Sequence, residues 1–306
     1  MLIYRILGTV FAALAGLAFG SFLNVCVTRW PEEESTVAPR SHCRNCGHML
    51  AWWENVPVVS WIALRGRCRS CGAWIGWRYP LAELAVAALW AVLTWRFLAL
   101  ALNPGIPAIA PALHWNLYNE VGRTITLFIF FWTLIAVAIL DAEYLWIPDW
   151  LTIPGILLGV ASEMTYEIVG DQYSAALLSS PLQTAGRIAL RCLAGVLAAA
   201  GLILLIRWIY RLVRKHEGIG LGDAKLMAML AAWLGFGGAL LAFCIGVVLG
   251  AAVAVIALGL PSSRAADHEE WALKKMPLGT FLCIGGIVSG LWGKPLIAAY
   301  LRWAGF

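Results

Sequence analysis

Long apolar stretches separated by short polar segments recur along the whole chain. Each is close to the roughly 20 mostly apolar residues that an α-helix needs to cross a lipid bilayer. They predict helices near 4–26, 80–102, 123–141, 150–169, 187–208, 226–241, 242–260 and 278–303. The sixth and seventh are hard to separate, because only Phe236, Gly237 and Gly238 offer a break, and the pattern predicts about eight spans. A basic segment, and no small-residue cleavage site, follows the first stretch, which favours a retained helix over a signal peptide.

The composition excludes an ordinary soluble protein. Hydrophobic residues make up 61% of the chain and charged residues only 13%, against about 45–50% and 25% in soluble domains. Too few polar side chains remain to cover the molecule in water, so lipid is the expected solvent. The 17 tryptophans agree, because indole rings favour the membrane–water boundary. The predicted fold class is an all-α polytopic membrane protein in the bilayer.

Basic residues predict the orientation. The loops after the first, third, fifth and seventh helices hold 15 of the 22 lysines and arginines. Short basic loops stay in the cytoplasm, which places these loops inside and both termini outside. The net charge of +5 then follows from topology, and no nucleic-acid partner is expected. The predicted organisation is a first transmembrane helix over 1–27, a cytoplasmic loop domain over 28–79 and a seven-helix membrane domain over 80–306.

Half of the eight cysteines form two CxxC pairs in the first cytoplasmic loop. The pairs are Cys43 with Cys46 and Cys68 with Cys71. Four thiolates at such a spacing favour a closed, structural Zn²⁺ site with no position for water. A disulfide or a redox dithiol is the alternative, which a reducing cytosol disfavours. The adjacent His42 and His48 are interpreted as bystanders, and Cys26, Cys192, Cys244 and Cys283 as small core residues.

Two aspartates lie at the ends of predicted spans. Asp141 ends the third helix in AVAILDAEYLWIPD, and Asp223 opens the sixth in GIGLGDAKLM. Ionisable residues at membrane depth are functional candidates, and the charge-derived topology places both at the cytoplasmic boundary. Two adjacent carboxyls share a proton, so that one activates water while the other polarises a peptide carbonyl. This pattern predicts an aspartic protease whose glycines at 218, 220 and 222 admit an extended substrate.

Other interpretations of these motifs remain open. Asp223 after a glycine turn is also typical of a helix N-cap, and GIGLG imitates a nucleotide-binding fingerprint but lacks the strand that such a fold requires. Asp149 is a candidate cap of the fourth helix, and Glu143 a solvated charge. A different class of function, a non-catalytic transporter or assembly scaffold with paired carboxylates, is the alternative to an enzyme. Ion coupling, however, usually places charges near the bilayer midplane.

Four motifs in order resemble the type IV prepilin peptidases, which are bifunctional leader peptidases and N-methyltransferases. The similar segments are GSFLNVCVTRWP (20–31), the cysteine loop through YPLAE (43–83), DAEYLWIPD (141–149) and GIGLGDAKLM (218–227). One departure is Arg44, where the family commonly has proline; we expect this to affect the turn and not the metal. Presenilin-like GxGD proteases share the glycine–aspartate motif but lack the cysteine loop.

The resemblance implies a function in the bacterial cytoplasmic membrane. Asp141 and Asp223 would be the catalytic pair that cleaves prepilin or type II secretion pseudopilin leaders on the cytoplasmic side. A second activity would methylate the new N-terminus with S-adenosylmethionine. The resemblance assigns no residues to the methyl donor, for which the 43–83 loop is the expected region.

Overall fold

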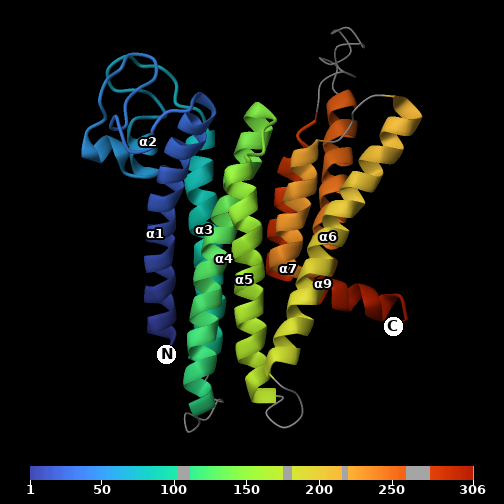
Figure 1. Cartoon of the computed structure of the whole chain (residues 1–306). Coiled ribbons are helices and arrows are strands. Elements are labelled where there is room, and N and C mark those ends of the chain that lie inside the picture. The colour runs from blue at the N-terminus through green and yellow to red at the C-terminus, as the bar shows by residue number, and fades with distance from the viewer. Residues whose placement is uncertain (103–110, 175–180, 216–219, 260–275, 306) are drawn as a thin grey trace. The chain divides into compact units, whose positions relative to one another are not determined.

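The computed structural model describes residues 1–102, 111–174, 181–215, 220–259 and 276–305, and these are mostly helical (Figure 1). The long helices are α1 (Leu2–Arg29), α3 (Arg78–Ala101), α4 (Pro111–Tyr144), α5 (Asp149–Ser174), α6 (Pro181–Arg214), α7 (Leu221–Gly259) and α9 (Leu278–Trp303). Between α1 and α3 lie the 3-10 turns Trp30–Glu32 and Trp52–Asn55 and the short helix α2 (Val59–Ala63). Extended pairing within the described ranges consists of two isolated bridges, which confirms the predicted all-α class.

Six of the described helices are long and apolar enough to cross a membrane, and α5 is not one of them. The predicted count of eight spans is therefore not confirmed. Large apolar side chains such as Phe11, Leu197 and Val248 are exposed along these helices. In water such surfaces would aggregate, whereas lipid accepts apolar side chains and requires only that backbone groups be paired within the helix. The chain is a multi-pass membrane protein.

The chain divides into two compact units, Met1–Ala136 and Val137–Phe306, with the division inside α4. The domain boundaries expected from the sequence, at 27 and 79, stay a prediction. Unit 1 carries the cysteine loop, and unit 2 carries both aspartates.

In unit 1, small residues let α1 and α3 pack with their backbones in close contact. A methyl group placed on Gly16 would lie 2.7 Å from Ala87 Cα, and one on Gly20 would lie 2.6 Å from Glu83 Cα. This GxxxG spacing is the usual means of close helix approach in membranes, where packing replaces the hydrophobic effect. The two helices are the stem on which the cysteine loop is built.

In unit 2, α7 is interrupted at Gly235. This residue has φ 69° and ψ 170°, values that lie outside the helical region and that only glycine adopts readily. The sequence predicted the break at Phe236–Gly238, one residue later. Figure 1 shows two orange helical segments side by side on either side of the break.

Contacts with α9 show that the chain reverses at this glycine. After the break, Ser289 donates a hydrogen bond to the Gly238 carbonyl (2.8 Å), and a methyl group on Gly246 would lie 3.1 Å from the Phe281 carbonyl. This segment therefore runs antiparallel to α9 and passes its first turn at Gly246, 13 residues before the helix ends at Gly259. The segment before the break begins at the same place, because Ile147 lies against both Gly222 and Gly279. The start of α7 and the middle of its second segment thus both lie against the start of α9.

Candidate active site and metal centre

Asp141 lies in the last turn of α4 and is only 5% exposed. Its Oδ2 accepts a hydrogen bond from the backbone N–H of Thr280 (2.7 Å) and lies 3.1 Å from the Thr280 hydroxyl. Thr280 is in the first turn of α9, whose N–H groups have no partners within the helix. The carboxyl of one helix therefore caps the start of another, where the helix dipole favours negative charge.

Asp223 lies in the first turn of α7 and is 8% exposed. Its Oδ2 accepts a hydrogen bond from the Gly220 N–H (3.0 Å), the residue just before the helix. The side chain thus reaches back in the manner of the acidic residue in a capping box. The alternative interpretation of Asp223 as the N-cap residue is wrong, because Asp223 lies inside the first turn and not before it. Its carboxyl nevertheless accepts from one N–H group at this helix end.

The structure brings the two aspartates together at one end of unit 2. The carboxyls of Asp141 and Asp223 interact electrostatically with each other, and both act on the fully buried thiol of Cys283. The side chain of Ile147, in the α4–α5 turn, lies against the glycine that precedes Asp223. Lys225 Nζ lies 2.5 Å from Asp149 Oδ1, so this exposed pair ties the starts of α7 and α5. Glu143 is exposed, as expected.

The glycines before Asp223 differ in their surroundings. A methyl group on Gly220 would lie 3.4 Å from Asp223 Oδ2, and one on Gly222 would lie 3.0 Å from Ile147 Cβ. Gly222 thus makes room for Ile147, a role the sequence did not suggest. Gly218 lies outside the described residues, and substrate binding by the three glycines stays a prediction.

Two residues of the site were missed by sequence analysis. Gly279 packs against Asp141, since a methyl group there would lie 2.9 Å from Oδ2, and Thr280 supplies the hydrogen bonds. The available signal was a Gly-Thr pair at the start of an apolar stretch. That signal is weak because it does not identify the carboxyl that the helix end would meet.

In unit 1 the four cysteines of the two CxxC pairs converge. Their sulfurs all lie within 4.8 Å of one another, with Cys43 and Cys71 3.8 Å apart and Cys46 and Cys68 4.0 Å apart. A tetrahedral ion with bonds of ~2.3 Å to sulfur requires separations of ~3.8 Å. The cluster therefore fits one such metal ion.

The two halves of the cluster share one backbone pattern. The amide of Gly47 donates to the Cys43 carbonyl (2.8 Å), and the amide of Gly72 donates to the Cys68 carbonyl (2.9 Å). Both glycines have positive φ, 71° and 69°, which a side chain would strain. Each CxxC-Gly is thus a tight turn that presents two sulfurs on one side.

Residues next to the cluster contact its sulfurs but are not themselves part of the cluster. Asn45 lies 3.5 Å from Cys71 Sγ, and hydrogen bonds from its amide, from the Ala73 backbone and from the other thiols lower the pKa of Cys71 to about 6, toward the thiolate that binds metals. Among the described residues, the cluster that fits a metal contains no histidine: His42 lies by the Arg40 carbonyl, and His48 by Glu54.

The remaining cysteines are not all core residues. Cys26 and Cys283 are buried as predicted, but Cys192 is half-buried and Cys244 is exposed. The prediction was wrong for Cys244 because an apolar stretch in a membrane helix has a lipid-facing side as well as a packed side.

These features define a multi-pass membrane protein with a buried pair of acids in one unit and a four-cysteine cluster that fits a metal ion in the other. Residues 14–97 match the model of the bacterial peptidase A24 N-terminal domain, and residues 128–255 match the model of the type IV leader peptidase family. The chain belongs to the type IV leader peptidase family, and it is an enzyme.

Curated relatives match nearly the whole chain. A prepilin leader peptidase/N-methyltransferase of Pseudomonas aeruginosa is 32% identical over 96% of this chain and 93% of its own length. A relative of the same name from Burkholderia pseudomallei is 34% identical over 93% of this chain and 85% of its own length. Another from Aeromonas salmonicida is 30% identical over 94% of this chain and 92% of its own length. No solved structure matches the chain.

Proposed function

We propose that this protein is the prepilin leader peptidase and N-methyltransferase of a bacterial inner membrane, with Asp141 and Asp223 as its catalytic pair. Its clients are type IV prepilins or type II secretion pseudopilins, cut on the cytoplasmic side. One observation carries the catalytic assignment: two carboxyls from distant segments lie buried at one end of unit 2, and each uses Oδ2 to bond a helix start.

The arrangement supports general acid–base hydrolysis. Two adjacent carboxyls cannot both ionise cheaply, so the pair holds one proton and titrates as a unit. The ionised member takes a proton from water, and the protonated member donates a hydrogen bond to the peptide carbonyl. We assign these roles to the two Oδ1 atoms, because both Oδ2 atoms hold backbone N–H groups in place. A scissile peptide must be extended for this attack, which favours the membrane boundary over its interior.

The cytoplasmic placement rests on charge. The basic loops that follow the odd-numbered predicted helices include the turn before Asp223, with Arg211, Arg214 and Lys215. Loops rich in lysine and arginine remain in the cytoplasm. A prepilin leader is delivered on the same side under this proposal.

The two implied cofactors have different roles, one structural and one chemical. Cys43, Cys46, Cys68 and Cys71 would hold Zn²⁺, whose part is to cross-link the loop. S-adenosylmethionine would supply the methyl group that is transferred to the new N-terminal amine.

The test is cleavage of a prepilin by the protein purified in detergent. We expect Asp141→Asn and Asp223→Asn each to lower the rate at least about 10³-fold, because an amide can neither take up nor share the proton. Glu143→Gln, an exposed carboxyl two residues from Asp141, is the matched control and should cleave normally. Retained activity in either aspartate variant would remove that residue from the pair.

A second measurement separates this mechanism from a metalloprotease. Brief exposure to a chelator should leave cleavage unchanged, since the proposed zinc is structural and closed to water. Rapid loss of cleavage with the helices still folded would contradict the acid-pair mechanism.

A further inference from the structure

Three tryptophans of unit 1 form an exposed cluster where the cysteine loop joins α3. The ring centroid of Trp61 lies 4.4 Å from that of Trp77 and 5.7 Å from that of Trp74. Trp61 is fixed by a hydrogen bond from its Nε1 to the Ile75 carbonyl (2.9 Å). Trp74 and Trp77 nevertheless remain 55% and 61% exposed. Exposed apolar patches of this kind mark contacts with membranes or with other proteins.

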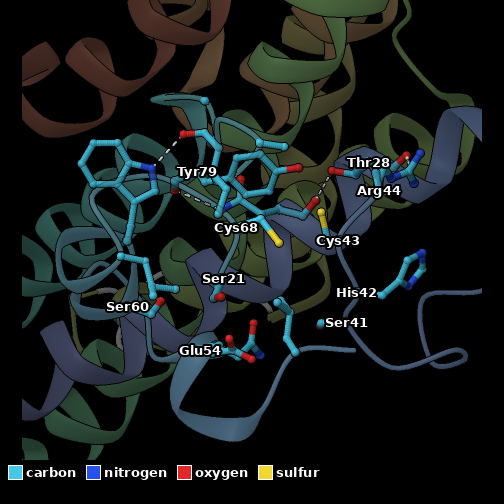
Figure 2. A pocket seen from close by; sticks show the side chains of 18 of the residues that line it. Ser21, Thr28, Ser41, His42, Cys43, Arg44, Glu54, Ser60, Cys68 and Tyr79 are labelled. Atoms are coloured by element: carbon cyan, nitrogen blue, oxygen red, sulfur yellow. Dashed lines mark hydrogen bonds between the residues drawn. The ribbon is translucent and has the colours of Figure 1, made fainter. Parts of the chain in front are cut away.

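The short helix α2, which carries Trp61, extends this surface. Figure 2 shows Ser60 of α2 among the side chains that line the cavity between the end of α1, the cysteine loop and the start of α3. Val59 and Ile62 do not line that cavity and are 61% and 63% exposed. A helix packed on a core in water would turn such apolar side chains inward. We use the term apolar loop surface for four residues: Val59, Ile62, Trp74 and Trp77.

The exposed side of α3 indicates the depth of this surface in the membrane. Trp77 immediately precedes α3, and exposed apolar residues then recur every three or four positions at Leu81, Leu84, Ala88, Val92 and Trp95. This spacing places them on one side of the helix. Trp77 and Trp95 are separated by about 27 Å at 1.5 Å per residue, close to the ~30 Å of the hydrocarbon core. Tryptophans gather at the two boundaries of that core, so Trp77 and its cluster lie at one of them.

Arginines accompany the cluster. Residues 59–78 contain four arginines and no acidic residue, and among them Arg65 and Arg67 are exposed. Gly66, between these two, packs against the cluster, since a methyl group there would lie 2.7 Å from the Trp74 ring. Arg65 and Arg67 therefore flank the apolar loop surface.

Anionic lipid headgroups complement this surface in charge. The planar guanidinium of arginine matches the geometry of a phosphate group, and basic residues beside a membrane are attracted to its anionic lipids. Two carboxyls of the region are held elsewhere: Glu54 is buried and accepts from the Ala51 amide, and Glu83 is buried and accepts from the Val58 amide. The exposed charge beside the tryptophans is therefore positive.

We propose that the cysteine loop rests on the membrane through the apolar loop surface, with Arg65 and Arg67 bound to phosphate groups of anionic phospholipids. The partner is the bilayer that surrounds α3, because the surface continues the lipid-facing side of that helix at the depth of Trp77. This contact holds the loop against one leaflet beside its stem. The proposal goes beyond the proposed function: it depends on the chain being a membrane protein and on neither catalytic activity.

The first test is photo-cross-linking of the full wild-type chain in lipid nanodiscs. One preparation contains phosphatidylglycerol with a photoreactive group near its headgroup, and the other contains phosphatidylcholine with the same group. We expect mass spectrometry to find label in peptides covering 59–67 and 74–81, with more label from phosphatidylglycerol. Label on α3 that does not extend to residues 59–67 would overturn the proposal.

A double variant, Arg65→Gln with Arg67→Gln, tests the charge. Basic residues near an anionic surface each strengthen binding about fivefold, so the preference for phosphatidylglycerol should fall at least about fivefold, with the thermal transition unchanged. Arg40→Gln, an exposed arginine of the same loop outside residues 59–78, is the matched control and should keep the preference. An undiminished preference in the double variant would overturn anionic lipid as the partner.

Ile62→Glu tests the apolar contact. A charged side chain is costly at membrane depth, so we expect label on residues 59–67 to fall at least about fivefold in both lipids. Val37→Glu is the matched control, because Val37 is 88% exposed in the same loop and outside the surface. Equal label in Ile62→Glu and wild type would overturn the proposal. Label that reaches this surface from a photoreactive prepilin and never from lipid would identify a protein partner and overturn it as well.

Discussion

The two units hold their polar groups by different physical means. In unit 1 a loop of 48 positions between α1 and α3 (30–77) carries the chemistry, and four cysteines gather it around one point. In unit 2 the chemistry sits directly on helix ends: the carboxyl of Asp141 caps α9, and that of Asp223 caps the start of its own helix α7. One site depends on a cross-link within a loop, and the other on the packing of long helices.

The difference teaches how each site can fail. A loop with two short bridges and a few turns has little hydrophobic core, so removal of its cross-link should release the whole site. A site made from helix ends fails instead when the helices shift, because the hydrogen bond from Thr280 joins α9 to α4, and Ile147 packs against the starts of both α7 and α9. Four substitutions test this contrast, in order of decreasing effect.

Removal of one proposed zinc ligand should have the largest effect. In Cys68→Ser we expect loss of bound zinc and fast amide exchange across the loop, because structural zinc sites contribute on the order of 10 kcal/mol to folding. The helices of unit 2 should exchange as in wild type. Zinc content and hydrogen exchange by mass spectrometry measure both.

Cys244→Ser is the control, because Cys244 is exposed in unit 2 and outside the cluster. A loop that stays protected in Cys68→Ser would show that unit 1 does not depend on its cross-link, and the contrast between the units would disappear.

A steric clash at a helix contact in unit 2 should have the second-largest effect. A methyl group on Gly285 would lie 2.1 Å from the Ala242 carbonyl oxygen, so Gly285→Ala must push α9 from the second half of α7. We expect a loss of roughly 1–3 kcal/mol in stability, seen as a lower thermal transition, together with reduced cleavage. Zinc binding should be unchanged. Gly201→Ala, where a methyl group would meet nothing within 4 Å, should have no effect; equal damage from both would contradict the packing argument.

Thr280 tests the hydrogen bonds that position Asp141. Thr280→Val keeps the backbone N–H that holds Oδ2 but removes the hydroxyl 3.1 Å away. We expect kcat for cleavage to fall about tenfold with little change in KM, since a hydrogen bond to a charged group contributes ~1.5–3 kcal/mol at most. Thr280→Ser should restore the rate. A change in KM alone, or no rescue by serine, would argue against a positioning role.

Arg44 should matter least. Its guanidinium pairs with Glu32 (2.6 Å) and Glu34 (3.3 Å), but all three side chains are well exposed. Exposed ion pairs contribute ~0–1 kcal/mol, so Arg44→Ala should shift stability by less than about 1 kcal/mol and keep one zinc per chain. Loss of zinc in this variant would show that the residue after the first cysteine determines the metal as well as the turn.

Local patterns predicted much of this protein. The spacing of the cysteines was enough to predict the four-cysteine cluster, because two CxxC turns each bring two sulfurs together within a few residues. The apolar stretches predicted the helices, including a break within one residue of Gly235. The stretch at 150–169 predicted a span, but α5 is not among the six described helices that are long and apolar enough to cross a membrane.

The sequence by itself determined that the chain lies in a membrane, that it is helical, that four cysteines cluster, and which two aspartates are candidate catalytic residues. Each of these follows from composition or from residues close together in the chain. Only the tertiary structure decided which groups meet those acids. Thr280 lies 139 positions from Asp141, and Gly279 packs against the same carboxyl. Contacts of this kind depend on how helices pack, and helix packing is set by shapes and glycine contacts that no local pattern contains.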